Sequence, residues 1–220
     1  MWRLLFHAGR SLILEGCLSL PPPFTQGFFM TRDQFTPRTI HHTEGAASPH
    51  AAHPPLETVF TSRTTWNEKR PHVLVVACSD GRLQENVDDF LHNRLGIDSY
   101  DRLFIPGGPG AFAQSGHEFL RADQLRSECL FLLRAHLIEE VILIFHGAAP
   151  DGPRDSICAD YSRKLPSHQP HQIRAQQEDD TQYLLERVFS PSQQLRVRVY
   201  RAEVQADLSV RFVDLLDTEK

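Results

Sequence analysis

The chain has 220 residues, of which 40% are hydrophobic and 23% charged, and its formal net charge is −5. These proportions are typical of a soluble globular protein. The negative net charge argues against nucleic acid as the main partner. No apolar stretch approaches the ~18–20 residues that a membrane helix needs. We therefore expect neither nucleic acid binding nor membrane insertion.

A change in composition divides the chain near residue 65. The first 65 residues are rich in proline, including Pro21-Pro22-Pro23, and show little periodicity, which is typical of irregular segments. Their basic, apolar start resembles a targeting segment, but Glu15 interrupts the apolar run and no small-residue cleavage site follows. Met30 is an alternative first residue. We expect residues 1–65 to be a disordered extension or a wrongly assigned start, and residues 66–220 to form one domain.

The domain opens on an uninterrupted apolar run from Val73 to Ala77, rich in β-branched residues. A run without polar alternation predicts a strand that is buried on both faces, as in a parallel sheet. Strand-like and helix-like segments then alternate. We expect helices over 87–95, 118–136, 157–164 and 172–189, and further strands over 101–105, 141–145, 195–203 and 208–215. This alternation predicts an α/β fold with a mainly parallel sheet of four strands plus an edge strand, and with helices on both faces.

Reactive side chains follow two of the expected strands. Cys78, Asp80 and Arg82 come directly after the first run, and His146 follows the run that ends at Phe145. Parallel strands would bring Cys78 and His146 to one carboxyl edge of the sheet, where open α/β sheets bind ligands. Thiolate and imidazole are ligands that zinc prefers. Arg82 can hold the Asp80 carboxylate in a charge-assisted fork, and a fixed carboxylate can orient water beside a metal.

These residues resemble the signatures of β-class carbonic anhydrases. The resemblance rests on the Cys-x-Asp-x-Arg stretch from Cys78 to Arg82 and on His146-Gly147. It runs from about residue 72 to 215, includes a strand and glycine-containing loop over 101–110, and looks most like a divergent bacterial branch. It implies that Cys78 and His146 bind zinc, and that the pair Asp80 and Arg82 orients the zinc-bound species during reversible hydration of carbon dioxide to bicarbonate. The resemblance also implies a homodimer.

The sequence departs from the family pattern at the third zinc ligand. The pattern is His-x-x-Cys, and Ala149 stands at the cysteine position. Cys158, twelve residues after His146, is one replacement, because some members that resemble this fold place their last cysteine about that far along. Asp151 and Asp155 are alternative ligands. Two alternatives to this activity stay open: a degenerate site in a fold retained for binding or assembly, and hydrolysis of a related small molecule such as a carbon–sulfur compound.

The other features of the domain have simpler interpretations. The four cysteines are far apart, which argues against a disulfide framework and favours reduced thiols in the cytoplasm. Cys129 falls on an apolar helical stripe and is expected in the core. The loop from Pro106 to Gly110 lacks the ending of a phosphate loop, so we expect a tight turn that brings backbone near the site. A narrow apolar substrate pocket is expected near Phe112.

Overall fold

The computed structural model describes residues 57–113, 119–189 and 195–216. The chain divides into two units, Met1–Thr61 and Ser62–Lys220, and all the described helices and strands belong to the second. Most of the expected N-terminal extension, including Cys17, lies outside the described residues. None of the helices described is both long and apolar enough to cross a membrane.

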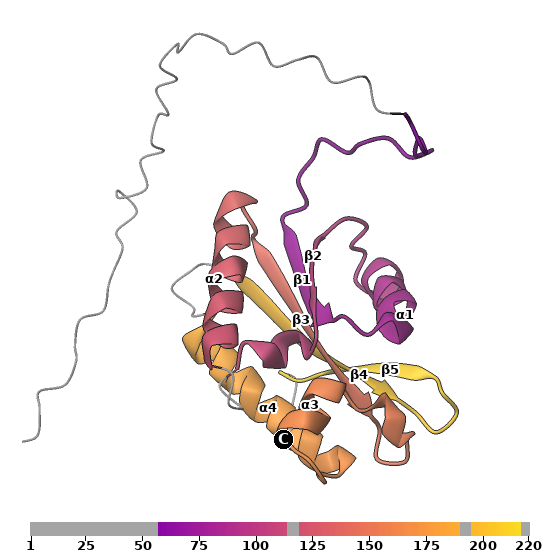
Figure 1. Cartoon of the computed structure of the whole chain (residues 1–220), viewed down its shortest axis with the longest axis vertical. Helices are drawn as coiled ribbons and strands as arrows, with labels where there is room; N and C mark the ends of the chain where they lie inside the picture. Colours follow the sequence, from indigo (N-terminus) through magenta and orange to yellow (C-terminus); the bar gives the residue numbers. More distant parts are fainter. Residues whose placement is uncertain (1–56, 114–118, 190–194, 217–220) are drawn as a thin grey trace, which may run out of the picture. The chain divides into compact units, whose positions relative to one another are not determined.

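A five-stranded sheet forms the centre of the second unit (Figure 1). Its strands, in the order β2-β1-β3-β4-β5, are all parallel except β5, which pairs antiparallel with β4 at one edge. The α/β prediction of four parallel strands and an edge strand is therefore confirmed. The strand bounds are β1 Val73–Cys78, β2 Asp101–Ile105, β3 Glu140–Ala148, β4 Arg196–Val204 and β5 Val210–Asp214.

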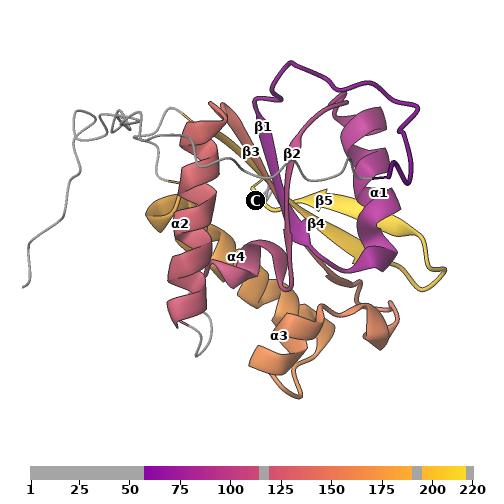
Figure 2. The same ribbon diagram turned by 45° about the horizontal axis from the view of Figure 1, so that its top comes forward.

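Helices cover both faces of the sheet, as Figure 2 shows: α1 lies on one side, and α2 and α4 lie on the other. The helix bounds are α1 Gln84–Asp89, α2 Phe119–Ala135, α3 Ala159–Lys164 and α4 Pro170–Arg187. The buried apolar residues accordingly form two clusters, one on each face. Along β1, Leu74 and Val76 belong to the first cluster, and Val75 and Ala77 belong to the second. This double burial explains why the first strand has no polar alternation.

The first helix begins earlier than its apolar spacing predicts. The Asp80 carboxylate accepts a hydrogen bond from the Arg82 backbone N–H, which caps a 3₁₀ turn over Gly81–Leu83. Helix α1 follows this turn directly, and a π-helical turn over Phe90–Arg94 continues it. A side chain of the site therefore also starts the helix that follows it.

The third strand is longer than its apolar run. It extends to Ala148 because β4 pairs with it all the way to Val204. The sequence predicted that His146 follows the strand. In the structure His146 lies inside it. The Ala149 N–H then donates to the Val204 carbonyl at 2.9 Å, so Ala149 continues the backbone pairing with β4.

Candidate metal centre

The strand order reverses around β1, which has β2 on one side and β3 on the other. In open α/β sheets such a reversal leaves a crevice at the carboxyl ends of the strands. Cys78 is the last residue of β1, and His146 lies near the end of β3, two residues beyond the pair Ala77–Ile144. The topology therefore brings these two side chains to one place, as the sequence predicted.

Three zinc-type donors meet at this crevice. The ligand atoms of Cys78, His146 and Cys158 all lie within 4.8 Å of one another, and the two sulfur atoms are 4.0 Å apart. Among the described residues, these three form the one group of Cys, His and carboxylate side chains that is close enough to hold an ion. Neither Asp151 nor Asp155 belongs to it. Of the replacements considered for the third ligand, the structure brings Cys158 to the other two.

The imidazole of His146 is buried at 4% exposure, and neither ring nitrogen has a hydrogen-bond partner among the described residues. Buried polar atoms without a partner cost free energy, so such an atom needs a specific explanation. A metal ion bound to one of the two ring nitrogens explains why that nitrogen has no hydrogen-bond partner. Two sulfur donors and one imidazole match a zinc site, and catalytic zinc sites usually have three protein ligands.

The two thiols form a coupled pair. The pKa of Cys78 is lowered well below its usual range, first by a hydrogen bond from Cys158 and then by nearby His146. The contact with Cys78 and burial both raise the pKa of Cys158. Burial alone raises the pKa of Cys129 to about 12, in the apolar core where the sequence placed it. Cys78 is therefore the thiol that is ready to act as a ligand.

Helix α3 fixes Cys158, the residue immediately before it. The Tyr161 hydroxyl on α3 donates to the Asp180 carboxylate of α4 at 2.5 Å. Lys164, at the other end of α3, donates to the Gly110 carbonyl at 3.1 Å. The third donor thus depends on contacts that a short helix makes with α4 and with the glycine loop.

The glycine loop approaches the site closely, as expected from Pro106 to Gly110. Gly108 has a φ of 54°, and a Cβ there would lie 2.9 Å from the Cys78 nitrogen. Gly107 has a φ of 90°, and a Cβ there would lie 2.4 Å from the Asp160 carboxylate. Only glycine satisfies both the backbone angle and the space at these two positions.

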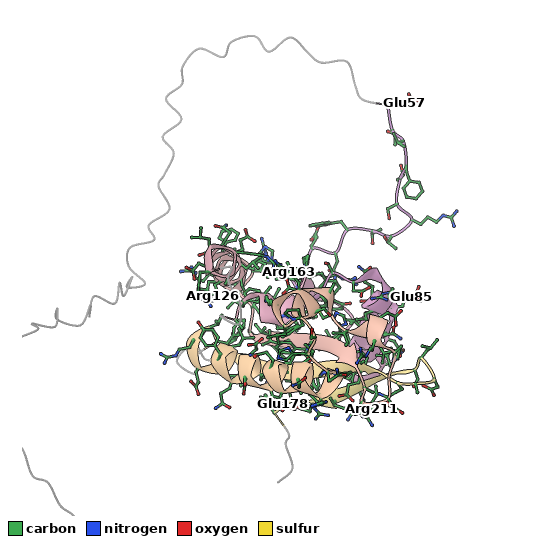
Figure 3. The ribbon with its side chains drawn as sticks, turned by 60° about the horizontal axis from the view of Figure 1, so that its bottom comes forward. Glu57, Glu85, Arg126, Arg163, Glu178 and Arg211 are labelled. Carbon is green, nitrogen blue, oxygen red and sulfur yellow. The ribbon has the colours of Figure 1, made fainter. Side chains whose placement is uncertain are left out.

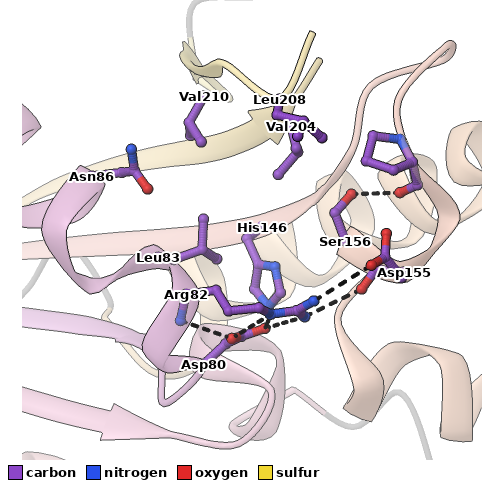
Figure 4. A pocket seen from close by; sticks show the side chains of 11 residues that line it. Asp80, Arg82, Leu83, Asn86, His146, Asp155, Ser156, Val204, Leu208 and Val210 are labelled. Atoms are coloured by element: carbon purple, nitrogen blue, oxygen red, sulfur yellow. Dashed lines mark hydrogen bonds and ion pairs between the residues drawn. The ribbon is translucent and has the colours of Figure 1, made fainter. Parts of the chain in front are cut away.

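Asp80 and Arg82 form the predicted fork beside His146 (Figure 4). The Arg82 Nη2 lies 2.7 Å from Asp80 Oδ2, and Nε lies 3.0 Å from Oδ1. Arg82 Nη2 also donates to the Asp155 carbonyl at 3.2 Å, which links the fork to the loop before Cys158. The Arg82 guanidinium holds the pKa of Asp80 at about 2, so the carboxylate is ionised at neutral pH.

Replacing Arg82 with methionine should raise the pKa of Asp80 from about 2 back toward 3.8. Because the folded-state pKa is the lower value, the fork stabilises the fold above pH ~4 and loses this effect as the pH falls toward 2. Carboxyl ¹³C NMR on the full chain measures the titration. Arg102→Met is the matched control, because Arg102 pairs with Asp88 instead. An unshifted Asp80 titration in Arg82→Met would contradict the fork.

A cavity of about 280 Å³ opens beside the fork and His146. Its apolar wall comes from Leu83 and from the β4–β5 hairpin, which supplies Val204, Leu208 and Val210. Asn86 and Ser156 add polar groups. Phe112, near which the sequence predicted the pocket, is fully buried in the core and does not line this cavity.

Sequence reasoning missed these cavity walls. Leu208 and Val210 lie more than 60 residues after His146, and their apolar character only indicated an edge strand. The hairpin register, which pairs Val204 with Val210, is what carries them to the site. The one available signal was that β5 follows β4 through a short turn, so its start must lie near the carboxyl end of β4.

No family model and no curated protein matches the sequence. Among solved structures, the β-carbonic anhydrase CafA of Aspergillus fumigatus is similar at 14% identity and a TM-score of 0.33, over 69% of this chain and 79% of that chain. The β-carbonic anhydrase isoform I of Trichomonas vaginalis is similar at 14% identity and a TM-score of 0.32, over 70% of this chain and 87% of that chain. A similarity of this size leaves the function to be argued from the site itself.

Proposed function

We propose that this protein is a zinc enzyme that interconverts carbon dioxide and bicarbonate. The observation that carries the proposal is the meeting of Cys78, His146 and Cys158 beside the ionised Asp80–Arg82 fork. The sequence resemblance to β-class carbonic anhydrases points to the same residues, apart from Cys158.

Cys78, His146 and Cys158 would hold the ion. A bound zinc ion supplies Lewis acidity, which makes a nucleophile available near neutral pH. Asp80 would accept a hydrogen bond from the attacking water and orient it toward the carbon. Arg82 would hold the Asp80 carboxylate in place through two of its nitrogens and keep it ionised.

The charges around the cavity favour a neutral substrate. The Arg82 guanidinium contacts the Asp80 carboxylate at 2.7 Å and lies 3.9 Å from that of Asp155. Two carboxylates therefore face the one cation, which leaves little attraction for an incoming anion. Carbon dioxide is neutral and fits the apolar wall of the cavity, and the anionic product would be released more readily from such a site.

Zinc per chain, measured on protein purified without added metal, should be near one equivalent. Stopped-flow measurement should then detect carbon dioxide hydration. Asp80→Asn should keep the zinc and lower turnover by about 10²–10⁴-fold, because it removes a group that orients the reacting water. Asp88→Asn is the matched control, because Asp88 pairs with Arg102 away from the site. Zinc near zero in the unmodified chain would refute the proposal and favour a degenerate fold.

The cavity supports a second candidate, hydrolysis of a small carbon–sulfur compound at the same centre. A volume of about 280 Å³ is several times the ~30 Å³ that one water occupies in the liquid. It therefore has room for a small neutral molecule with sulfur in place of oxygen as well as for carbon dioxide. Sulfide release from carbonyl sulfide or carbon disulfide, measured beside carbon dioxide hydration, distinguishes the two reactions.

Three finer predictions from the sequence stay predictions: placement in a bacterial branch of the family, a cytoplasmic location and a homodimer. Sedimentation of the purified chain tests the homodimer. A species of one chain mass at micromolar concentration would rule it out.

A further inference from the structure

Behind the site lies a group of buried polar side chains that the proposed reaction does not use. We call Gln177 of α4 with Arg201 and Glu203 of β4 the buried arginine network. All three are at most 1% exposed. Arg201 Nε donates to Gln177 Oε1 at 2.7 Å, and Arg201 Nη1 pairs with Glu203.

Two further arginines connect the network to the surface. Arg174 on α4 lies 3.4 Å from Glu203 Oε1, and Arg211 on β5 lies 2.7 Å from Glu203 Oε2. Figure 3 shows the outer end, where Glu178 of α4 and Arg211 of β5 are labelled. Glu203 is thus held by cations from three elements, which explains why its pKa stays lowered despite burial that would raise it.

The network contacts β3 where that strand carries a metal donor. Gln177 Nε2 donates to the His146 carbonyl at 3.0 Å, and Arg201 Nη2 donates to the Ala148 carbonyl at 3.0 Å. Gly147 lies between them, and a Cβ there would lie 2.8 Å from Arg201 Nη2. The lack of a side chain at Gly147 therefore lets Arg201 approach the strand.

This end of β3 needs such support. β1 pairs with β3 only as far as Ile144, so beyond that residue the strand has β4 alone as a neighbour. A metal-binding histidine is usually oriented by a hydrogen bond at its second ring nitrogen. His146 has no such partner among the described residues. Its orientation must therefore come from its backbone and packing.

We infer that Gln177 and Arg201 are positioning residues for the metal centre, which hold the backbone of His146 so that its imidazole faces the two cysteine sulfurs. The inference rests on the proposed function, because it assigns a role in metal binding. It is independent of which small molecule reacts. A buried ion pair is often no more stabilising than apolar packing, so fixing one geometry is the better reason for these charges.

Metal affinity of the full chain tests this role. Gln177→Leu removes the donor to His146, and Gln177→Glu removes it while keeping an oxygen for Arg201. Both variants should bind zinc about 10–100-fold more weakly in competition with a chelator, as is usual when support behind a metal ligand is lost. Both should also change the visible spectrum of the cobalt(II)-substituted protein, which reports ligand geometry and needs no turnover.

Thr181→Val is the matched control. Thr181 is equally buried on α4 and its hydroxyl donates to the Gln177 carbonyl within the helix. The Thr181→Val variant should be less stable than the unmodified chain but should keep its zinc affinity and its cobalt(II) spectrum. Should Gln177→Leu fail to fold, Gln177→Glu carries the test. A folded Gln177 variant with unchanged zinc affinity and an unchanged cobalt(II) spectrum would overturn this inference alone. If the chain without substitutions takes up neither zinc nor cobalt, the proposed function and this inference are both overturned.

Discussion

Replacing Cys158 with serine is expected to abolish stable zinc binding and, with it, carbon dioxide hydration. A serine hydroxyl is not ionised at neutral pH, and two remaining donors hold zinc poorly. The loss of affinity should exceed the ~10–100-fold that follows from changes behind a ligand. Metal content by mass spectrometry and chelator competition measure it on the full chain.

Cys129→Ser is the control for the Cys158 experiment. Cys129 is fully buried in the apolar core on α2 and lies outside the group of metal donors. Its replacement should lower stability and leave zinc binding intact. Equal, metal-replete behaviour of the two serine variants would show that Cys158 is not the third ligand, and attention would return to the carboxylates of the preceding loop.

Replacing Glu203 with glutamine should lower the free energy of unfolding by about 3–5 kcal/mol, because breaking a buried ion pair leaves the partner charge uncompensated. Glu203 is fully buried and pairs with Arg201, which is 1% exposed. Glutamine keeps the size and one acceptor oxygen, so the change isolates the charge. Chemical denaturation of the full chain measures the difference.

Glu178→Gln makes the same chemical change in an exposed pair. Glu178 lies 2.9 Å from Arg174, and the two side chains are 40% and 42% exposed. Exposed pairs contribute about 0–1 kcal/mol, so this variant should unfold almost as the unmodified chain does. Comparable losses for Glu203→Gln and Glu178→Gln would mean that the buried Arg201 charge does not depend on Glu203 for its compensation.

The sequence was sufficient to predict the sheet and the placement of most side chains of the candidate site. Val73 to Ala77 and Val141 to Phe145 have no polar alternation, and this property identified them as strands buried between helices. The carboxyl ends of parallel strands lie at one edge of the sheet, so the sequence predicted that Cys78 and His146 lie close together. The Asp80–Arg82 fork followed from a spacing of two residues, which is a local property.

The rest depends on contacts between distant segments. Cys158 and the loop carboxylates were chemically possible ligands, and only the docking of α3 decides between them. On β4, the pairing of Arg201 and Glu203 could not be predicted from the sequence, because their partners include cations and an amide from α4 and β5. Gln177 gave no signal at all, since one more polar residue on a polar helix is unremarkable without its position against β3.

His146 and Cys158 lie 68 and 80 residues after Cys78 in the sequence. The three candidate donors are on β1, on β3 and directly before α3. Donors so far apart in sequence cannot form a chelate in the unfolded chain without closing long loops, which costs entropy. Metal loading should therefore come late, after the parallel sheet has assembled. An ion that binds only the folded chain shifts the folding equilibrium by mass action. Under the proposed function, the availability of zinc in the cell would then set how much of this protein survives proteolysis.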